Sequence, residues 1–241
     1  MRTRYKIIVL LIIISIGLLS IWWQDQKQNM YDRSLRNSYN YYIELTTDST
    51  LNNVTLYLPL PVINNTSSVG LDILEHGFND DEDPSWKYAL VDTEQGLMLS
   101  IKNEKIEPKY TTSNKNSEKI QRPSMFRIML FSNQTIDTMS PLGNEMVLMP
   151  KYNLTRNVTR SSSRLAPEKF DYESKMYAYY DTSSNANVII SIYLCGMNEW
   201  SIAGWRHNSY WEDIRIELSG PQDGWTTVNG QLFAGEGTYK I

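Results

Sequence analysis

The sequence predicts an all-β protein, with a β-sandwich-like domain preceded by one N-terminal transmembrane helix. An uncharged, strongly apolar run from Ile7 to Trp23 predicts the helix. Beyond it, short segments rich in Tyr, Ile, Val and Trp alternate with clusters of Gly, Asn, Asp and Pro, which is the pattern of strands and turns. No second long helical period follows, so we favour a sandwich, with a barrel as the alternative architecture.

The apolar run has the dimensions of a membrane span. Its 17 residues extend over about 25 Å as a helix, and a bilayer core of about 30 Å is crossed if Tyr5 joins and Lys6 snorkels. Three basic residues within 1–6 precede the run, so the positive-inside rule places this segment in the cytoplasm. Everything beyond Gln24 is then expected on the outer side of the membrane.

Two other interpretations of this run are weaker. A cleaved signal peptide needs a small-x-small site, and the tolerable one, Ser15-Ile16-Gly17, falls inside the apolar run. The pair Trp22-Trp23 resembles an interfacial anchor. A buried helix of a soluble protein is the other alternative, but Ile, Leu and Val lie on all sides of this run. We therefore expect a retained anchor at 7–23.

The rest of the chain divides into a stalk and one β-rich domain. Residues 24–38 contain neither Pro nor Gly, so we expect a stalk that extends the helix. Residues 39–241 form the extracytoplasmic domain, with a split into two smaller β-domains as the alternative. Long polar loops are expected at 103–123 and 151–170. The strands are expected at about 39–47, 54–62, 86–92, 97–102, 125–131, 145–149, 175–181, 187–194, 200–205, 212–218 and 231–240.

Two segments carry the clearest strand signals. In 54–62, aliphatic residues alternate with polar residues and prolines, and Pro59 and Pro61 remove two neighbouring donors from one edge. We therefore expect an outer strand or a strand end there. The stretch WKYALVDTEQGLMLSI predicts a hairpin whose turn lies around Thr93 to Gly96.

Six asparagines fit the N-x-[ST] rule for N-glycosylation. They are Asn53, Asn64, Asn65, Asn133, Asn153 and Asn157. The Asn, Ser and Thr content of the chain alone predicts about 3.4 such matches, so the excess is less than twofold. The sequons by themselves leave glycosylation and chance equally open.

The charge of the chain argues against nucleic-acid binding. The net charge of −4 and the pI near 5.3 leave no basic excess, which makes nucleic acid a poor partner. Basic residues do gather between Lys151 and Lys169, where a solvated loop is favoured over an anion or polysaccharide contact.

His76 and His207 belong to no metal-ligand spacing, and we expect turn or surface positions for both. Cys195 lies inside an apolar run and is expected to be a buried, inert thiol.

The acidic stretch NDDEDP is the one candidate for a metal. Asp80, Asp81 and Asp83 offer hard oxygen ligands that suit Ca²⁺, but the stretch lacks the alternating spacing and the glycine of an EF-hand loop. A solvated loop is the favoured interpretation, with a weak calcium site as the alternative. No other cofactor is expected.

Four late tryptophans are the candidate ligand-binding residues, namely Trp200, Trp205, Trp211 and Trp225. Rings exposed on a sheet face would stack on sugars or on a partner, whereas inward-pointing rings fill the core. Core packing is favoured. A regular strand would place Trp200 and Trp205 on opposite faces, unless Gly204 disturbs it.

Four stretches resemble uncharacterised, membrane-anchored extracytoplasmic proteins of methanogenic archaea: NVTLYLPLPV, WKYALVDTEQGLMLSI, SPLGNEMVLMPKYNL and GWTTVNGQLFAGEGTYKI. The resemblance covers most of the outer domain. That group has no assigned activity, so it supplies no catalytic residue. It implies an archaeal envelope, where surface proteins are commonly N-glycosylated. Sugars at Asn53 and at Asn64 or Asn65 would then flank the unpaired edge of 54–62.

The sequence therefore predicts a non-catalytic surface protein, with a binding or a structural role in the cell envelope. Its expected partners are the lipid bilayer and an envelope polysaccharide or surface protein. One alternative is a carbohydrate-binding module that uses the four tryptophans. Another is a glycoside hydrolase, because its two carboxylates need not be near each other in sequence.

Overall fold

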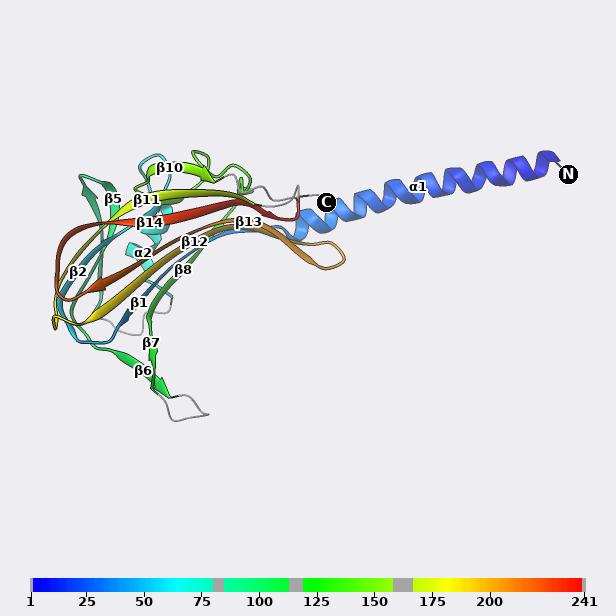
Figure 1. Cartoon of the computed structure of the whole chain (residues 1–241). Helices are drawn as coiled ribbons and strands as arrows, with labels where there is room; N and C mark the ends of the chain where they lie inside the picture. The colour runs from blue at the N-terminus through cyan, green and yellow to red at the C-terminus, as the bar shows by residue number, and fades with distance from the viewer. Residues whose placement is uncertain (1, 80–84, 113–118, 158–166, 240–241) are drawn as a thin grey trace.

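The computed structural model describes residues 2–79, 85–112, 119–157 and 167–239, with the backbone alone at 2–5 and 112. One long helix, α1 (Arg2–Ser34), projects from one end of a curled β-sheet (Figure 1). The helix covers the predicted span 7–23 and most of the expected stalk 24–38, and β1 (Arg36–Thr47) begins two residues after it. No flexible linker of any length therefore separates the helix from the sheet.

Ten antiparallel strands form the main sheet. Nine follow the order β4 (Lys87–Thr93), β5 (Gly96–Ile106), β2 (Leu51–Leu58), β11 (Glu168–Asp181), β14 (Gln222–Gly237), β13 (Trp205–Ser219), β12 (Asn187–Ser201), β1 and β8 (Ser124–Ser132). The tenth, β10 (Tyr152–Asn157), pairs with the part of β11 that β2 leaves open. Two small pairs are the remaining strands of the described residues: β3 (Leu60–Val62) with β9 (Val147–Met149), and β6 (Lys109–Thr112) with β7 (Lys119–Arg122).

The sheet curls around helix α2 (Ser68–His76), which contacts both edge strands, β4 and β8. Phe78 follows α2 and packs edge-on against Tyr88 of β4 and Phe126 of β8, at centroid distances of 5.1 and 5.5 Å. Trp86 packs on the same Phe126 ring at 4.8 Å. These rings seal the gap between the two edges, so the inner face of the whole sheet encloses one core.

Burial alternates along the strands with a period of two residues. In β12 every second residue from Val188 to Trp200 is buried, while the residues between them are only partly covered. The inner face therefore carries the core, and the outer face is open to solvent, as expected for an antiparallel sheet. Each strand thus presents a defined set of side chains on the outer face.

The chain leaves the main sheet where the two prolines predicted a strand end. β2 stops at Leu58, and β3 starts at Leu60 as a separate inner pair with β9. The Tyr41 hydroxyl donates a hydrogen bond to the carbonyl of Pro59 at 2.8 Å, which ties the crossing point to β1. The predicted strand end is confirmed, but β2 itself lies between β5 and β11 and is not an outer strand.

The all-β class with one N-terminal apolar helix is confirmed. The structure adds α2, a nine-residue helix too short to give a clear period, with the Ser67 side chain capping it by accepting from the Gly70 N–H. Part of each predicted long loop is strand, because β6, β7 and β10 lie within 103–123 and 151–170. The expected strand at 200–205 is the tip of the β12–β13 hairpin.

Candidate binding surface on the outer face of the sheet

Four aromatic side chains form a continuous stack across the outer face, which we call the aromatic ladder. Tyr42, Tyr193, Trp211 and Phe233 lie on the neighbouring strands β1, β12, β13 and β14. Successive centroids are 4.7, 6.0 and 4.1 Å apart, and the interplanar angles are 30°, 22° and 14°. Such cross-strand stacking stabilises the sheet beyond simple burial.

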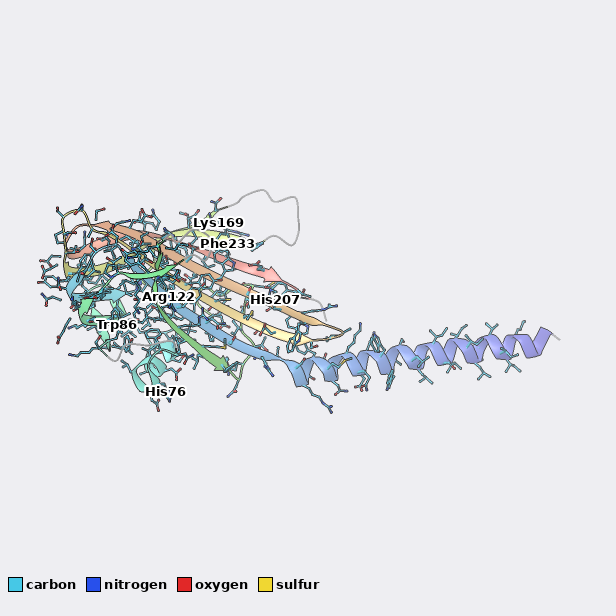
Figure 2. The ribbon with its side chains drawn as sticks, turned by 90° about the horizontal axis from the view of Figure 1, so that it is seen from below. His76, Trp86, Arg122, Lys169, His207 and Phe233 are labelled. Atoms are coloured by element: carbon cyan, nitrogen blue, oxygen red, sulfur yellow. The ribbon has the colours of Figure 1, made fainter. Side chains whose placement is uncertain are left out.

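A cation lies at each end of the ladder. The guanidinium carbon of Arg127 lies 5.8 Å from the Tyr42 centroid, and the Lys169 ammonium lies 5.5 Å from the Phe233 centroid. Figure 2 shows Lys169 and Phe233 next to each other. Because Tyr193 and Trp211, in the middle of the ladder, each have a neighbouring ring on both faces, the ladder offers mainly ring edges to solvent. A sugar that needs a free ring face finds none on Trp211.

A second aromatic group on the outer face has a different geometry. Tyr57 of β2, Tyr177 of β11 and Trp225 of β14 form the Trp225 cluster. The two tyrosines stack at 5.0 Å and 25°, whereas the indole is inclined to them by 53° and 65°. Trp225 is 36% exposed, and no described ring stacks parallel to it. The indole is therefore partly exposed, and no parallel ring of the described residues covers either of its faces.

Next to this cluster, four outward-facing residues are in register across four strands, and we call them the basic row. Lys87 of β4 pairs with Lys102 of β5. Lys102 also pairs with Thr55 of β2, and Thr55 pairs with Tyr179 of β11. All four line one groove of about 530 Å³, together with Asn53, Ser85, Asn103 and Glu104. The groove thus combines two ammonium groups with hydroxyl and amide groups.

The four predicted tryptophans lie in three separate places. Trp200 is 2% exposed and packs edge-on against Tyr31 of α1 at 5.5 Å, so it belongs to the joint between helix and sheet. Trp205 is 67% exposed beside the tip of the β12–β13 hairpin. Trp211 belongs to the ladder and Trp225 to its own cluster. Sequence proximity therefore does not bring the four rings into one site.

Sequence reasoning did not select the basic row, although a signal for it was present. A turn at Thr93–Gly96 fixes the register of the predicted hairpin, and that register places Lys87 opposite Lys102. The contributions of Thr55 and Tyr179 could not be found in this way, because β2 and β11 are far apart in sequence.

The six sequon asparagines are all exposed. Four of them have positive φ angles between 49° and 61°, namely Asn53, Asn64, Asn65 and Asn153. Asn64 and Asn65 form the two-residue turn between Ile63 and Thr66, and the other two coincide with shifts of strand register, Asn53 in the β2–β11 pairing and Asn153 in the β10–β11 pairing. Asn tolerates this left-handed conformation better than most residues, so local backbone geometry is one sufficient reason for these asparagines.

Three of the sequon amides in strands also donate to carboxylates. Asn53 Nδ2 lies 3.0 Å from Asp181, and Asn153 Nδ2 lies 2.8 Å from Glu173. Asn157 likewise donates to Asp171 at 2.9 Å. Attachment of a sugar at these positions would replace one of the amide hydrogens.

The candidate calcium ligands Asp80, Asp81 and Asp83 lie outside the described residues. Within the described ranges, no group of three or more His, Cys, Asp or Glu side chains could hold a metal ion. His76 and His207 are both exposed, and Figure 2 shows them far apart, on α2 and on β13.

The most deeply buried charges form a closed ion pair on the inner face. Lys151 and Glu212 contact each other, with side chains only 6% and 0% exposed. Glu212 also accepts hydrogen bonds from the Tyr172 hydroxyl at 2.8 Å and from the Leu148 N–H at 3.0 Å. The Lys151 ammonium lies 4.2 Å from the Tyr172 ring centroid. Burial lowers the pKa of Lys151, and the neighbouring Glu212 carboxylate acts in the opposite direction.

Cys195 lies on the outer face of β12, where burial raises the pKa of its thiol to about 11. At pH 8 the thiolate fraction is then about 0.001, against about 0.2 for an ordinary cysteine, so native alkylation by iodoacetamide should be roughly 200-fold slower. The rate should increase as the pH rises toward 11. Mass spectrometry of the native and urea-unfolded chain measures both rates, and equal rates at pH 8 would contradict the prediction.

In the comparisons with known proteins, the chain matches no protein-family model, no curated protein and no solved structure.

Proposed function

We propose that this chain is a non-catalytic binding module, held by α1 on the outer side of a membrane, with the outer face of the sheet as its recognition surface. The observation that carries the proposal is the surroundings of α1. The helix is long and apolar enough to cross a bilayer, and no part of its apolar window is buried by the rest of the described chain. Side chains such as Leu11 and Leu19 are more than half exposed, and lipid is the solvent that suits them.

The joint between helix and sheet supports a tether that also orients the domain. The Ser34 hydroxyl accepts a hydrogen bond from the Ser201 N–H at 2.9 Å, and Tyr31 packs on the buried Trp200. Both partners belong to the β12–β13 hairpin, which lies beside the end of α1 in Figure 1. A helix fixed in this way would present the outer face in a defined direction relative to the membrane. The excess of basic residues in 1–6 favours an outer location for the sheet.

Two features favour binding over catalysis. The buried pair Lys151–Glu212 is closed to solvent, so neither group reaches a substrate. Among the described residues, the groove over the basic row is lined by a single carboxylate, Glu104, whereas glycoside hydrolysis needs two. We therefore prefer binding to the hydrolase alternative.

Membrane extraction tests the anchor. The full chain should stay with the membrane fraction after alkaline carbonate washing. The double variant Leu11→Arg/Ile14→Arg should become extractable, because each arginine near the centre of a span costs about 3 kcal/mol of insertion. The matched control is Leu71→Arg, which changes an equally exposed leucine on α2 and should remain with the membrane.

Protease added to the outside of sealed cells or spheroplasts tests the orientation. It should degrade the sheet while leaving a fragment of α1 in the membrane. A sheet that is protected until the membrane is opened would show that the domain lies on the other side.

A further inference from the structure

We infer that the basic row and the Trp225 cluster together form a binding site for an anionic polysaccharide that carries its acidic groups at intervals. Lys87 and Lys102 would hold the acidic groups, and the Trp225 indole would stack on a sugar ring. The inference rests on the proposed function, because it names the ligand class of that outer face.

The pairing of the two lysines is the first reason. Lys87 and Lys102 are directly opposite each other on adjacent antiparallel strands, and like charges in this position destabilise a sheet. No described carboxylate forms an ion pair with either ammonium group. The repulsion between the two ammonium groups therefore lowers stability, with no compensating ion pair among the described residues. A bound anion between the two groups would turn the repulsion into attraction.

The neighbourhood of the lysines is the second reason. Thr55 precedes Tyr57 by two residues on β2, and Tyr177 precedes Tyr179 by two residues on β11, so the basic row and the Trp225 cluster are adjacent rows of one face. A sugar needs hydrogen-bonding groups for its hydroxyls and an apolar ring face for its C–H groups. The two rows supply both beside a positive charge.

The extent of the site indicates a polymer. From Lys87 on β4 to Trp225 on β14 the surface crosses β5, β2 and β11, which is four strand spacings or about 19 Å. One monosaccharide cannot reach from the lysines to the indole, whereas a short run of sugars can. The two ends of the site would then contact different units of the same chain.

The one carboxylate among the described residues that line the groove limits the charge density of the ligand. Glu104 is two residues from Lys102 on the same face and lines the same groove. It would repel a second acidic group close to the first and would accept hydrogen bonds from sugar hydroxyls. A polysaccharide with one carboxylate on each sugar fits this pattern better than a densely charged polymer such as nucleic acid.

The test uses the full chain in detergent micelles, produced in a host without N-glycosylation because Asn53 lines the groove. Polygalacturonate is the probe, and dextran is the uncharged comparison. The chain should bind polygalacturonate and not dextran, with partial quenching of tryptophan fluorescence. Lys87→Gln/Lys102→Gln should weaken binding by about tenfold or more, as expected for the loss of two charge contacts. Trp225→Ala should weaken it and remove the quenching.

The control is Lys109→Gln/Lys119→Gln, which removes the same charge from the exposed β6–β7 pair and should change affinity by less than about twofold. Lys87→Glu should raise the melting temperature slightly while abolishing binding, which a purely structural role of Lys87 does not predict. Equal losses in both double variants, binding of dextran with the same affinity, or no binding of polygalacturonate would each overturn the inference. Membrane retention is measured separately, so failure of the anchor is distinguishable from failure of the site.

Discussion

Replacing Glu212 by Gln should lower the free energy of unfolding by about 3 to 5 kcal/mol, because the substitution leaves the Lys151 ammonium buried without its counter-charge. Replacing Lys151 by Met should have a cost of similar size, since the carboxylate then remains alone. Both side chains are almost completely excluded from solvent, so water cannot take the place of the missing partner. Denaturant unfolding of the full chain in micelles, followed by tryptophan fluorescence, measures the effect.

The double variant Lys151→Met/Glu212→Gln separates the pair from its surroundings. Its loss of unfolding free energy should be smaller than the sum of the two single losses by at least about 1.5 kcal/mol, because no unpaired charge remains. Glu217→Gln, in the exposed pair with Arg215, is the matched control and should change stability by less than about 0.5 kcal/mol. Strictly additive losses would show that Lys151 and Glu212 do not act as a pair.

The second large effect is expected from Gly196→Ala. Gly196 pairs with Tyr210 across β12 and β13, and a β-carbon at residue 196 would overlap the Tyr210 ring. That ring is fully buried, and its hydroxyl donates to the Met146 carbonyl, so it cannot move aside freely. We expect a loss of about 2 to 4 kcal/mol from overpacking and a strained hydrogen bond.

A double-mutant cycle tests this cause. In a Tyr210→Leu background the overlap is gone, and Gly196→Ala should cost less than about 1 kcal/mol there. An equal cost in both backgrounds would place the effect in the backbone of residue 196 instead of its contact with Tyr210. Gly230 and Tyr172 repeat the arrangement on β14 and β11, so the same cycle should give a similar coupling there.

Most strands were predictable because each carries its own signal. Burial on one face of a sheet imposes a period of two, which the aliphatic residues of 54–62 show, whereas 187–194 is marked by its β-branched and aromatic residues. The elements that escaped prediction lack a local signal of this kind. β10 is exposed along its whole length, so it has no apolar alternation. α2 is stabilised by contacts with β3, β4 and β8, which lie outside its own segment.

The candidate site was predictable only in fragments. Trp225 was one of four candidate rings, but the sequence favoured core packing for these tryptophans and gave equal weight to Trp200 and Trp211. Whether a ring face is covered depends on its neighbours across the strands, and for Trp211 those neighbours are Tyr193 and Phe233. The buried partners Lys151 and Glu212 are 61 residues apart, and no local pattern joins them.

The sequence by itself determined the apolar helix, the all-β class and the hairpin that sets Lys87 opposite Lys102, because periodicity, propensity and turn chemistry act between residues close together in the chain. Only the tertiary structure decided which rings are stacked, which charges are enclosed and which four strands meet in the basic row. Those outcomes depend on the order of strands within one curled sheet, and strand order is a property of long-range pairing that no short stretch of sequence contains.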